Sequence, residues 1–544
     1  MSESLQCVNI DGCTCRKKDN VKISNFTVKV LAVKKCTCQS NTEYKYDIEF
    51  TSGNNTYRRQ ISKQELPKYD YSDIHPTLLL FPIPNANKEM AHAIMEQVQP
   101  SIIKEIYVAN ELGWHTYNGN HFYCAGDLIL SNASMQGIAI DINIPNLHFE
   151  YDSTMSEKDA LKAAFDTIKI APQITFLLFV ENLLGIIRQL LNDAGIQDTI
   201  CVLIVGRTHS QKTTVTKLVI SLYNRSNLDS GLQSTRMCSS LPIVEKMLTE
   251  MKDTSILLDD LNTSNQSSER KKQEALLHYA LRESGDNCGR ATLKTTAQVN
   301  AKVFITAEYV PDFSISDIGR TIILNVERPL ANDLLTKCQR HPLALSTFYK
   351  YFIEWISSKY DEIVYDIKCR YEKHRQTSCN SSNRYKRLDD QKFLLEYVFD
   401  LFLSYAKNLI DFDYEGFTQL FKEYLNNTIK NQLALIDKMQ LRERARNNLS
   451  SAVLAMWKCG YLTDLGKNSK CFKKNNCLYI TALHLAERLH SFIGVKLSTK
   501  NIVSYFRSHD FSGFYDDGTS KKIGNLRYLT LNFAELNMDA SKEH

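Results

Sequence analysis

The sequence is poor in the residues that loosen a globular fold. Its 544 residues include 20 glycines and 11 prolines, a content that argues against long flexible linkers. The hydrophobic content of 43% and the charged content of 23% are ordinary for folded proteins, which excludes wholesale disorder and collagen-like sequence. The 66 Lys and Arg nearly balance the 61 Asp and Glu, giving a net charge of +5. This mildly basic balance permits nucleic-acid binding without establishing it.

A membrane-spanning run and a secretion signal are also missing. The longest apolar run, residues 174–191, is interrupted by Glu181, Asn182 and Arg188. A membrane span tolerates such groups poorly, so we expect a buried helix and no membrane partner. Residues 1–18 are polar and lack the pattern of a signal peptide. The fifteen cysteines form no framework of the secreted type, so we expect reduced thiols and a cytoplasmic location.

Several cysteines near the start of the chain could be metal ligands. Two Cys-X-Cys pairs and one further cysteine lie there: Cys7, Cys13, Cys15, Cys36 and Cys38. Thiolates bind zinc, but structural zinc sites usually have about two to four residues between paired ligands. No nearby histidine completes a ligand set. Free thiols are therefore the favoured interpretation, and zinc remains the alternative.

The residue pattern divides the chain into four predicted domains. Residues 1–150 alternate between apolar and polar side chains, which indicates half-buried strands in a β-rich domain. In residues 151–330, short apolar runs alternate with helices, as in a parallel sheet covered on both faces. Residues 331–450 predict amphipathic helices, and residues 451–544 follow the order helix, turn, helix, basic hairpin of a winged helix. The predicted fold class is therefore α/β, with a central ATPase-like domain.

The strongest chemical signal is a buried strand followed by a phosphate-binding loop. The loop begins at Gly206 and ends in Lys212 and Thr213 before a helix, which is the layout of a P-loop. Lys212 would neutralise phosphate oxygens and the Thr213 hydroxyl would bind Mg²⁺. Gln211 stands where many P-loops have glycine. The predicted nucleotide-binding residues are Gly206, Arg207, Thr208, His209, Ser210, Gln211, Lys212, Thr213 and Thr214.

Three later strands end or begin at residues suited to phosphoryl transfer. A strand at residues 255–258 ends in Asp259 and Asp260; one acid must hold Mg²⁺ and a second must orient the attacking water. We assign Asp259 to the metal and Asp260 to the water, although glutamate is usual at the second position and the shorter Asp260 leaves fast turnover open. Thr306 ends the third strand and would touch the γ-phosphate or its water. Arg320 precedes the fourth, where it would serve a neighbour's ATP as an arginine finger; the alternative is an ordinary surface arginine.

At these residues the chain resembles the domain-of-unknown-function 927 (DUF927) proteins of bacterial mobile elements. Their ATPase core is similar to the MCM-like AAA+ helicases of staphylococcal cassette chromosomes and, more distantly, to superfamily-3 helicases. Gly113-Trp114-His115 is a family-like landmark. P-loops of the MCM type also have a residue other than glycine directly before the lysine, and in this chain that residue is Gln211. The family's acidic strand usually ends Leu-Asp-Glu-Leu, where this chain has Leu258-Asp259-Asp260-Leu261, and its third strand often ends Thr-Gly-Glu, where this chain has Thr306-Ala307-Glu308.

The resemblance also implies contacts with DNA. Helicases of this type place a β-hairpin before the third strand, where basic residues grip single-stranded DNA in a ring's channel, and Arg290 and Lys294 would do so here. The alternative is a surface loop with two cations.

In the predicted winged helix, Lys521, Lys522 and Arg527 would contact duplex DNA, although many such modules bind only protein.

The favoured hypothesis combines these signals into a motor. It is an ATP- and Mg²⁺-dependent DNA translocase or helicase that acts in the replication of a mobile genetic element. We expect it to form a homo-oligomeric ring with six subunits, a hexamer. Two alternatives stay open. One is a nucleotide-dependent DNA-binding switch with little hydrolysis, which Gln211 and Asp260 favour; the other is an anti-phage defence ATPase.

Overall fold

The computed structural model separates into two compact units, which are described in turn. The first comprises Met1–Tyr309, Asn325–Arg384 and Phe393–Tyr414, and the second comprises Val310–Leu324, Tyr385–Lys392 and Glu415–His544. The structure describes residues 7–38, 41–229, 231–262, 267–286, 290–291, 296–297, 299–311, 313–330, 332–379, 385–466, 469–494, 496–509, 511, 521–523 and 525–541.

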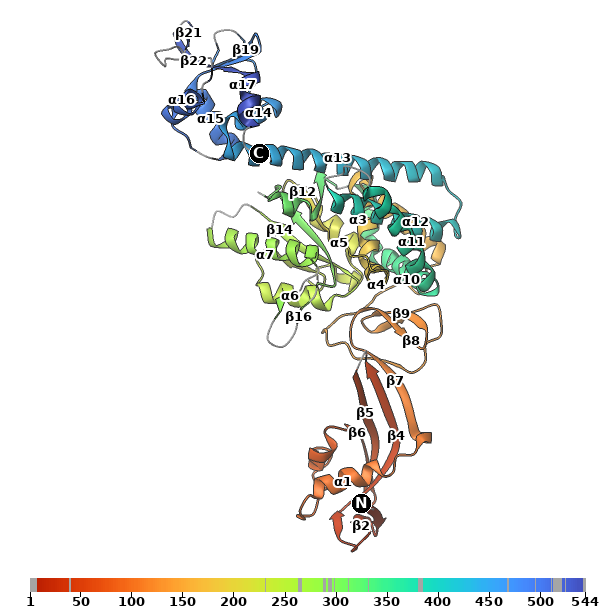
Figure 1. Ribbon diagram of the computed structural model, residues 1–544. Coiled ribbons are helices and arrows are strands. Elements are labelled where there is room, and N and C mark those ends of the chain that lie inside the picture. Colours follow the sequence, from red (N-terminus) through yellow and green to blue (C-terminus); the bar gives the residue numbers. More distant parts are fainter. Residues whose placement is uncertain are drawn as a thin grey trace. The chain divides into compact units, whose positions relative to one another are not determined.

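The N-terminal part of the first unit is rich in strands, as the alternating pattern predicts (Figure 1). Its largest sheet has the order β11-β7-β4-β5-β6, with β4 to β6 antiparallel and β7 parallel to β4. Val28, Ile48 and Phe50 lie on its buried face together with Met90 and Ile94 of helix α1. The elements are β1 (Cys7–Ile10), β2 (Cys13–Arg16), β3 (Lys22–Ser24), β4 (Thr27–Cys38), β5 (Asn41–Ser52), β6 (Asn55–Ser62), α1 (Ala86–Met95), β7 (Ile103–Ala109), β8 (Gly113–Tyr117), β9 (Asn120–Ala125), β10 (Leu128–Leu130) and β11 (Ile138–Ile140).

The N-terminal cysteines are free thiols as far as their side chains are described. Cys7, Cys13, Cys15 and Cys36 form no disulfide, and the side chain of Cys38 lies outside the described residues. Within the described part of the chain, no three His, Cys, Asp or Glu side chains come together as metal ligands. Burial raises the pKa of Cys7 to about 11, which keeps this thiol protonated at neutral pH.

The central part of the chain contains the predicted sheet, whose strands belong to the first unit except for residues 321–324 of β18, which are assigned to the second. Its five strands have the order β13-β14-β17-β12-β18, and the pairs β13–β14, β14–β17 and β12–β17 are parallel. Every residue of β12 and β17 is buried, because helices such as α3, α5 and α7 pack against the strands (Figure 1). The elements are α2 (Glu157–Ile168), α3 (Pro172–Ile186), α4 (Arg188–Asp193), β12 (Cys201–Gly206), α5 (Lys212–Ile220), β13 (Ser234–Arg236), α6 (Leu241–Glu250), β14 (Ser255–Leu261), α7 (Ser267–Asp286), β15 (Arg290–Ala291), β16 (Thr296–Ala297), β17 (Lys302–Ala307) and β18 (Thr321–Val326).

The long apolar run is buried, as predicted, but it forms two helices, α3 and α4, because the backbone leaves the helical conformation at Ile187. The polar residues of α3 have buried partners. The ammonium of Lys302 lies 2.7 Å from Glu181 Oε2 and 2.9 Å from Asp198 Oδ2, and all three side chains are inaccessible to solvent. The Asn182 carbonyl oxygen accepts a hydrogen bond from the Ser255 hydroxyl at 2.7 Å. These polar groups therefore join α3 to the sheet. No helix in the described ranges is long and apolar enough to cross a membrane.

Strand β8 is attached to the central part at Gly113 and Trp114. The Trp114 backbone N–H donates to Asp253 Oδ2 at 3.0 Å, and its indole N–H donates to the Ile186 carbonyl at 2.8 Å. Burial raises the pKa of Asp253 to about 6. Gly113 has a φ of +87°, and a Cβ at this position would lie 2.3 Å from Asp253 Oδ2. Only glycine therefore allows the strand to approach this carboxylate.

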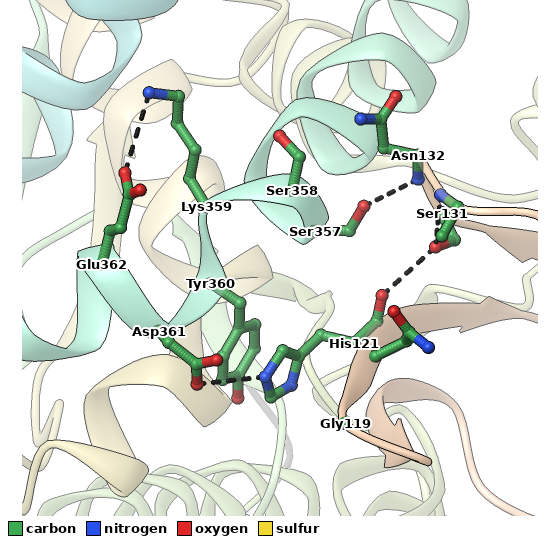
Figure 2. A pocket seen from close by; sticks show the side chains of 12 residues that line it. Gly119, His121, Ser131, Asn132, Ser357, Ser358, Lys359, Tyr360, Asp361 and Glu362 are labelled. Atoms are coloured by element: carbon green, nitrogen blue, oxygen red, sulfur yellow. Dashed lines mark hydrogen bonds and ion pairs between the residues drawn. The ribbon is translucent and has the colours of Figure 1, made fainter.

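A cavity of about 460 Å³ lies beside the same junction, between the β9 hairpin and the start of helix α11 (Tyr360–Cys379). Figure 2 shows its polar lining, with the His121 ring stacked on Tyr360 at a centroid distance of 3.9 Å. His121 Nε2 lies 3.0 Å from Asp361 Oδ1. These contacts hold the hairpin of β8 and β9 against α11, so the cavity lies beside a contact whose role is structural.

Helices predominate after Pro329, as predicted. They are α9 (Asp333–Arg340), α10 (Pro342–Ser358), α11, α12 (Lys386–Lys407) and α13 (Tyr414–Asn447). The aromatic side chains of α10 and α12 account for their packing, since Phe348 and Phe352 contact Tyr405, and Phe348 also contacts Phe402.

The second unit ends in a small α/β domain. A four-stranded antiparallel sheet has the order β19-β20-β22-β21, so the predicted basic hairpin is extended by a second hairpin that the sequence pattern did not reveal. The Ser498 side chain caps α16 by accepting a hydrogen bond from the Asn501 N–H. The elements are α8 (Ile315–Ile318), α14 (Leu449–Lys458), β19 (Cys471–Lys474), β20 (Cys477–Ile480), α15 (Ala482–Ile493), α16 (Thr499–Ser508), β21 (Lys521–Ile523), β22 (Leu526–Asn532) and α17 (Phe533–Ala540).

The Gly113 contact predicts a large difference between two glycine substitutions. Gly113→Ala and Gly119→Ala both place a side chain at positive φ, which costs about 1–2 kcal/mol in either position. Only at position 113 does the new Cβ meet another group, because nothing lies within 4 Å at position 119. We expect Gly113→Ala to lower the free energy of unfolding by at least about 2 kcal/mol more than Gly119→Ala, measured by urea denaturation. Equal losses would contradict the close approach to Asp253.

Candidate nucleotide site

The loop between β12 and α5 reverses direction through unusual backbone conformations. His209 and Gln211 have φ angles of 62° and 64°, in the left-handed region that favours glycine. Gln211 is also the N-cap of α5, and its side-chain oxygen accepts from the Thr214 hydroxyl at 2.9 Å. At Gly206, a Cβ would lie 2.8 Å from the Val326 Cβ, so glycine is required there. The residue that departs from the glycine-rich pattern, Gln211, therefore still adopts a conformation typical of glycine.

Lys212 is the first residue of α5 and bends back over the loop. Its ammonium group donates to the carbonyls of Gly206 at 2.8 Å and Arg207 at 3.0 Å. The side chain is buried, and burial lowers its pKa, while Glu308 and the two adjacent aspartates of β14 act in the opposite direction. The positive charge thus lies at the centre of the loop, at the N-terminus of a helix, where the helix dipole also favours an anion.

Asp259 is the meeting point of three elements that are distant in sequence. Its Oδ1 accepts from the Thr213 hydroxyl on α5 at 2.7 Å and from the Thr306 hydroxyl at the end of β17 at 2.5 Å. The carboxyl ends of parallel strands β14 and β17 lie at the same edge of the sheet, which explains the convergence. Carboxylate and hydroxyl oxygens are ligands that Mg²⁺ prefers, so Asp259 and Thr213 together could hold this ion.

Asp260 lies on an irregularity of β14, where the register with β17 shifts between Leu258 and Leu261. Its φ is 68°, and its backbone N–H donates to the Thr306 hydroxyl at 3.0 Å. The bulge places two adjacent acids within β14 before its pairing with β17 resumes at Leu261. Its carboxylate accepts from the Asn262 side chain at 3.1 Å. Thr306 therefore contacts both aspartates, one through each side of its hydroxyl.

Three residues near the loop were not assigned a role from the sequence. The Glu308 carboxylate accepts from the Thr208 hydroxyl at 2.5 Å, which ties the loop to the end of β17. Asn262, which contacts Asp260, accepts in turn from the buried Gln273 amide of α7 at 3.3 Å. The Thr306-Ala307-Glu308 motif pointed to Glu308 only through the family resemblance. No local pattern in the sequence marked Asn262 or Gln273.

The other predicted site residues lie elsewhere in the described structure or outside it. Arg320 belongs to the second unit, where its guanidinium donates to the Ser316 hydroxyl. β15 and β16 pair as the predicted hairpin, with Arg290 opposite Ala297, but the Arg290 side chain and the whole of Lys294 lie outside the described residues. Lys522 and Arg527 are exposed and opposite each other on β21 and β22, and the side chain of Lys521 is not described.

Comparison with protein families gives the chain's relationship directly. The model of the family described as "Domain of unknown function (DUF927)" matches residues 7–297, which is more than half of the chain. The chain belongs to the DUF927 family. The predicted resemblance is therefore confirmed, and the match includes the candidate loop and both aspartates. No curated protein matches this DUF927 chain.

Solved structures show which fold this DUF927 protein has. The structure titled "SCCmec type IV Cch - active helicase" has a TM-score of 0.53 and 14% sequence identity, and the match covers 99% of this chain and 98% of that one. At this identity the likeness establishes an α/β fold with a helicase-like core. A JCV helicase has a TM-score of 0.25 and 14% identity over 40% of this chain and 61% of that one. The NrS-1 C-terminal region has a TM-score of 0.26 and 9% identity over 69% of this chain and 87% of that one.

The contacts of Thr306 with both aspartates predict that substitution of this residue destabilises the DUF927 protein even when no nucleotide is present. Thr306→Val removes a fully buried hydroxyl and leaves the Asp260 N–H and the Asp259 carboxylate each without this partner. We expect the free energy of unfolding to fall by about 1–3 kcal/mol in urea denaturation. Thr306→Ser keeps the hydroxyl and serves as the control; if the serine variant loses as much, the hydrogen bonds are not responsible.

Proposed function

We propose that this protein is an ATP- and Mg²⁺-dependent DNA translocase or helicase that acts as a homo-oligomeric ring in the replication of a mobile genetic element. The observation that carries the proposal is the contact between Thr213 of the loop and Asp259 at the end of β14. A hydroxyl at the start of a helix and a carboxylate at the end of the neighbouring acidic strand are the pair that holds Mg²⁺ in P-loop ATPases. The helicase-like fold is consistent with this chemistry.

In the proposed nucleotide complex, the loop residues surround the phosphates. Backbone N–H groups from Gly206 to Thr214 would bind phosphate oxygens, and Lys212 would exchange its contacts with the Gly206 and Arg207 carbonyls for the β- and γ-oxygens. The Ser210 hydroxyl supports the same interpretation, since it is buried and has no hydrogen-bond partner in the described structure. Mg²⁺ would be held by Thr213 and Asp259 and would supply charge neutralisation at the transferred phosphoryl group.

Asp260 would orient or deprotonate the attacking water, and Thr306 would contact the γ-phosphate or this water. The bulge at Asp260 supports the assignment, because the hydrogen bonds from Asn262 and to Thr306 hold this residue beside the metal-binding carboxylate. Arg320 would act on the ATP of a neighbouring subunit and stabilise the charge that develops in the transition state. This last role requires the ring, because it places a residue of one subunit in another subunit's site.

The proposed DNA contacts come from two hairpins. Arg290 and Lys294 of the β15–β16 hairpin would grip single-stranded DNA in the channel, where contacts with phosphates make binding dependent on salt. In the C-terminal domain, helices α15 and α16 followed by the β21–β22 hairpin have the order of a winged helix. Lys521, Lys522 and Arg527 of this hairpin would contact duplex DNA.

A second candidate function is a nucleotide-dependent DNA-binding switch with little hydrolysis, and an anti-phage defence ATPase would share this chemistry. The specific observation in its favour is that the water-orienting role falls to an aspartate in a left-handed conformation, Asp260. Steady-state ATPase measurements with and without single-stranded DNA separate the candidates. A DNA-stimulated rate supports the motor, and tight ATP binding without turnover supports the switch.

Substitution of the loop lysine tests nucleotide binding itself. Lys212→Ala removes an ammonium that would pair with phosphate oxygens, so we expect Mg²⁺-ATP affinity to fall about 10- to 100-fold in calorimetric titration. A non-hydrolysable ATP analogue at about 100 times its dissociation constant should stabilise the wild-type protein by about 2.7 kcal/mol. After a 100-fold loss of affinity, the same concentration should stabilise the variant by only about 0.4 kcal/mol.

Lys217→Ala is the matched control for this experiment. Lys217 lies on the same helix, five positions after Lys212, and pairs with Asp229 at 2.7 Å rather than with the loop. Its substitution should leave nucleotide affinity unchanged. Indifference of the wild-type protein to ATP, or an equal loss in both variants, would refute the nucleotide site.

Removal of two exposed cations tests the C-terminal hairpin. We expect Lys522→Ala with Arg527→Ala to weaken duplex binding equally for different DNA sequences and to reduce the slope of log K against log salt by about 1–2. The control with the same charge change is Lys162→Ala with Lys337→Ala, because these lysines are already paired with Asp159 and Asp166. Fluorescence anisotropy over a salt series measures both slopes, and identical slopes would exclude the hairpin as a DNA contact.

A further inference from the structure

Gln432 is a buried polar residue on helix α13, with 2% of its surface exposed. Its side-chain amide is bonded on both sides to the segment that carries Arg320. The oxygen accepts from the Ile323 backbone N–H at 3.1 Å, and the NH₂ group donates to the backbone carbonyls of Ile318, at 2.9 Å, and of Thr321. All of these residues belong to the second unit.

The Gln432 side-chain amide makes the hydrogen bonds with this backbone that a neighbouring strand would otherwise make. β18 is the last strand in the order of its sheet, and an edge strand presents N–H and C=O groups without strand partners. A glutamine side chain has the same donor and acceptor as a peptide group, so it can bond Ile323 N–H and Thr321 C=O together. A helix cannot continue a sheet with its own backbone, which explains why a side chain supplies these bonds.

In the sequence, Arg320 lies between Ile318 and Thr321, whose backbone carbonyls both accept hydrogen bonds from the Gln432 NH₂ group. Its own backbone N–H donates to the Asp317 carbonyl at 3.0 Å, and the Thr321 hydroxyl donates to the same carbonyl at 2.6 Å. A capping box between Ser314 and Asp317 fixes the start of α8 just before. The backbone of Arg320 is therefore held from its own helix on one side and from α13 on the other.

We propose that Gln432 is a positioning residue that sets the place from which Arg320 reaches a neighbouring subunit's ATP. The inference rests on the proposed function, because it assigns Gln432 an effect through the arginine finger and not through the protein's own loop. An arginine finger acts only when its guanidinium is aligned with the transferred phosphoryl group, and a displacement of about 1 Å can lower the rate about 100-fold. A backbone bonded on two sides supplies this alignment before nucleotide is present.

The experiment uses mixed rings, because a finger defect and a loop defect complement each other in trans. Gln432→Met keeps the length and volume of the side chain and removes all three hydrogen bonds. Alone, it should lower the DNA-stimulated ATPase rate about 10- to 100-fold and leave ATP affinity unchanged. Mixed one to one with Lys212→Ala, it should regain about a quarter of wild-type activity, since random assembly pairs an intact loop with an intact finger at one interface in four.

Arg320→Ala mixed with Lys212→Ala is the reference for this design. If that mixture recovers activity and the Gln432→Met mixture does not, Gln432 acts only on the fold and the inference is overturned. If the Arg320→Ala mixture does not recover, the proposed arginine finger or ring fails instead. Full activity of Gln432→Met alone would also overturn the inference, since the finger would then be placed without these bonds.

Loss of helix packing is excluded by a second substitution in α13. Ile436→Ala removes a fully buried side chain one turn later on the same helix and leaves the Gln432 amide in place. It should lower the melting temperature without a defect that Lys212→Ala can complement. If Gln432→Met does not yield folded protein, Gln432→Asn replaces it, because its amide is one methylene too short to bond the same three groups, and the same complementation is expected.

Discussion

One carboxylate organises the candidate site. Asp259 accepts hydrogen bonds from Thr213 and Thr306, so that a single side chain joins the helix of the loop to two neighbouring strands. The loop adds a second constraint, because Lys212 bonds the carbonyls of Gly206 and Arg207 and keeps the backbone of the loop closed around its charge. Without these contacts, the acids and the loop would be separate features of an ordinary parallel sheet.

Buried polar groups support the site from the opposite end of the sheet. Lys302 begins β17, the strand that ends at Thr306, and it is held between Glu181 and Asp198 with no solvent access. Asp253 lies two residues before β14, the strand that leads to Asp259, and receives the Trp114 N–H. Breaking the buried Lys302 ion pairs would leave an uncompensated charge, and loss of the Trp114 N–H would leave the buried Asp253 carboxylate without this donor. Both changes are unfavourable, so these contacts fix where the two strands begin. The strand ends that carry the site inherit that placement.

Gln432 extends the same logic to the second unit. Where the sheet ends at β18, the side-chain amide bonds the strand edge and the turn that carries Arg320. In the proposed ring, the loop would bind nucleotide and Arg320 would reach a neighbour, and hydrogen bonds hold the backbone of both segments in this chain.

Local features were predictable from the residue pattern. The buried run of β12, the loop that ends in Lys212 and the Ser498 cap depend on residues close together in the chain, and each could be located from periodicity and side-chain type. The acidic strand was located in the same way, although its bulge at Asp260 was not. The extra hairpin of the C-terminal sheet was also missed, because Cys471–Lys474 is too short for alternation to distinguish it from a loop.

The residue order therefore determined which strands, helices and motifs exist, since burial patterns and caps act over a few positions. Which residues meet was decided by the tertiary structure, although the motif had already assigned Thr213 and Asp259 to the same Mg²⁺. Thr213 and Asp259 are 46 positions apart, Trp114 and Asp253 are 139 apart, and Gln432 and Ile323 are 109 apart. No periodicity spans such distances; these pairs form because parallel strands align their ends and because a buried donor or acceptor must find a partner wherever packing brings one.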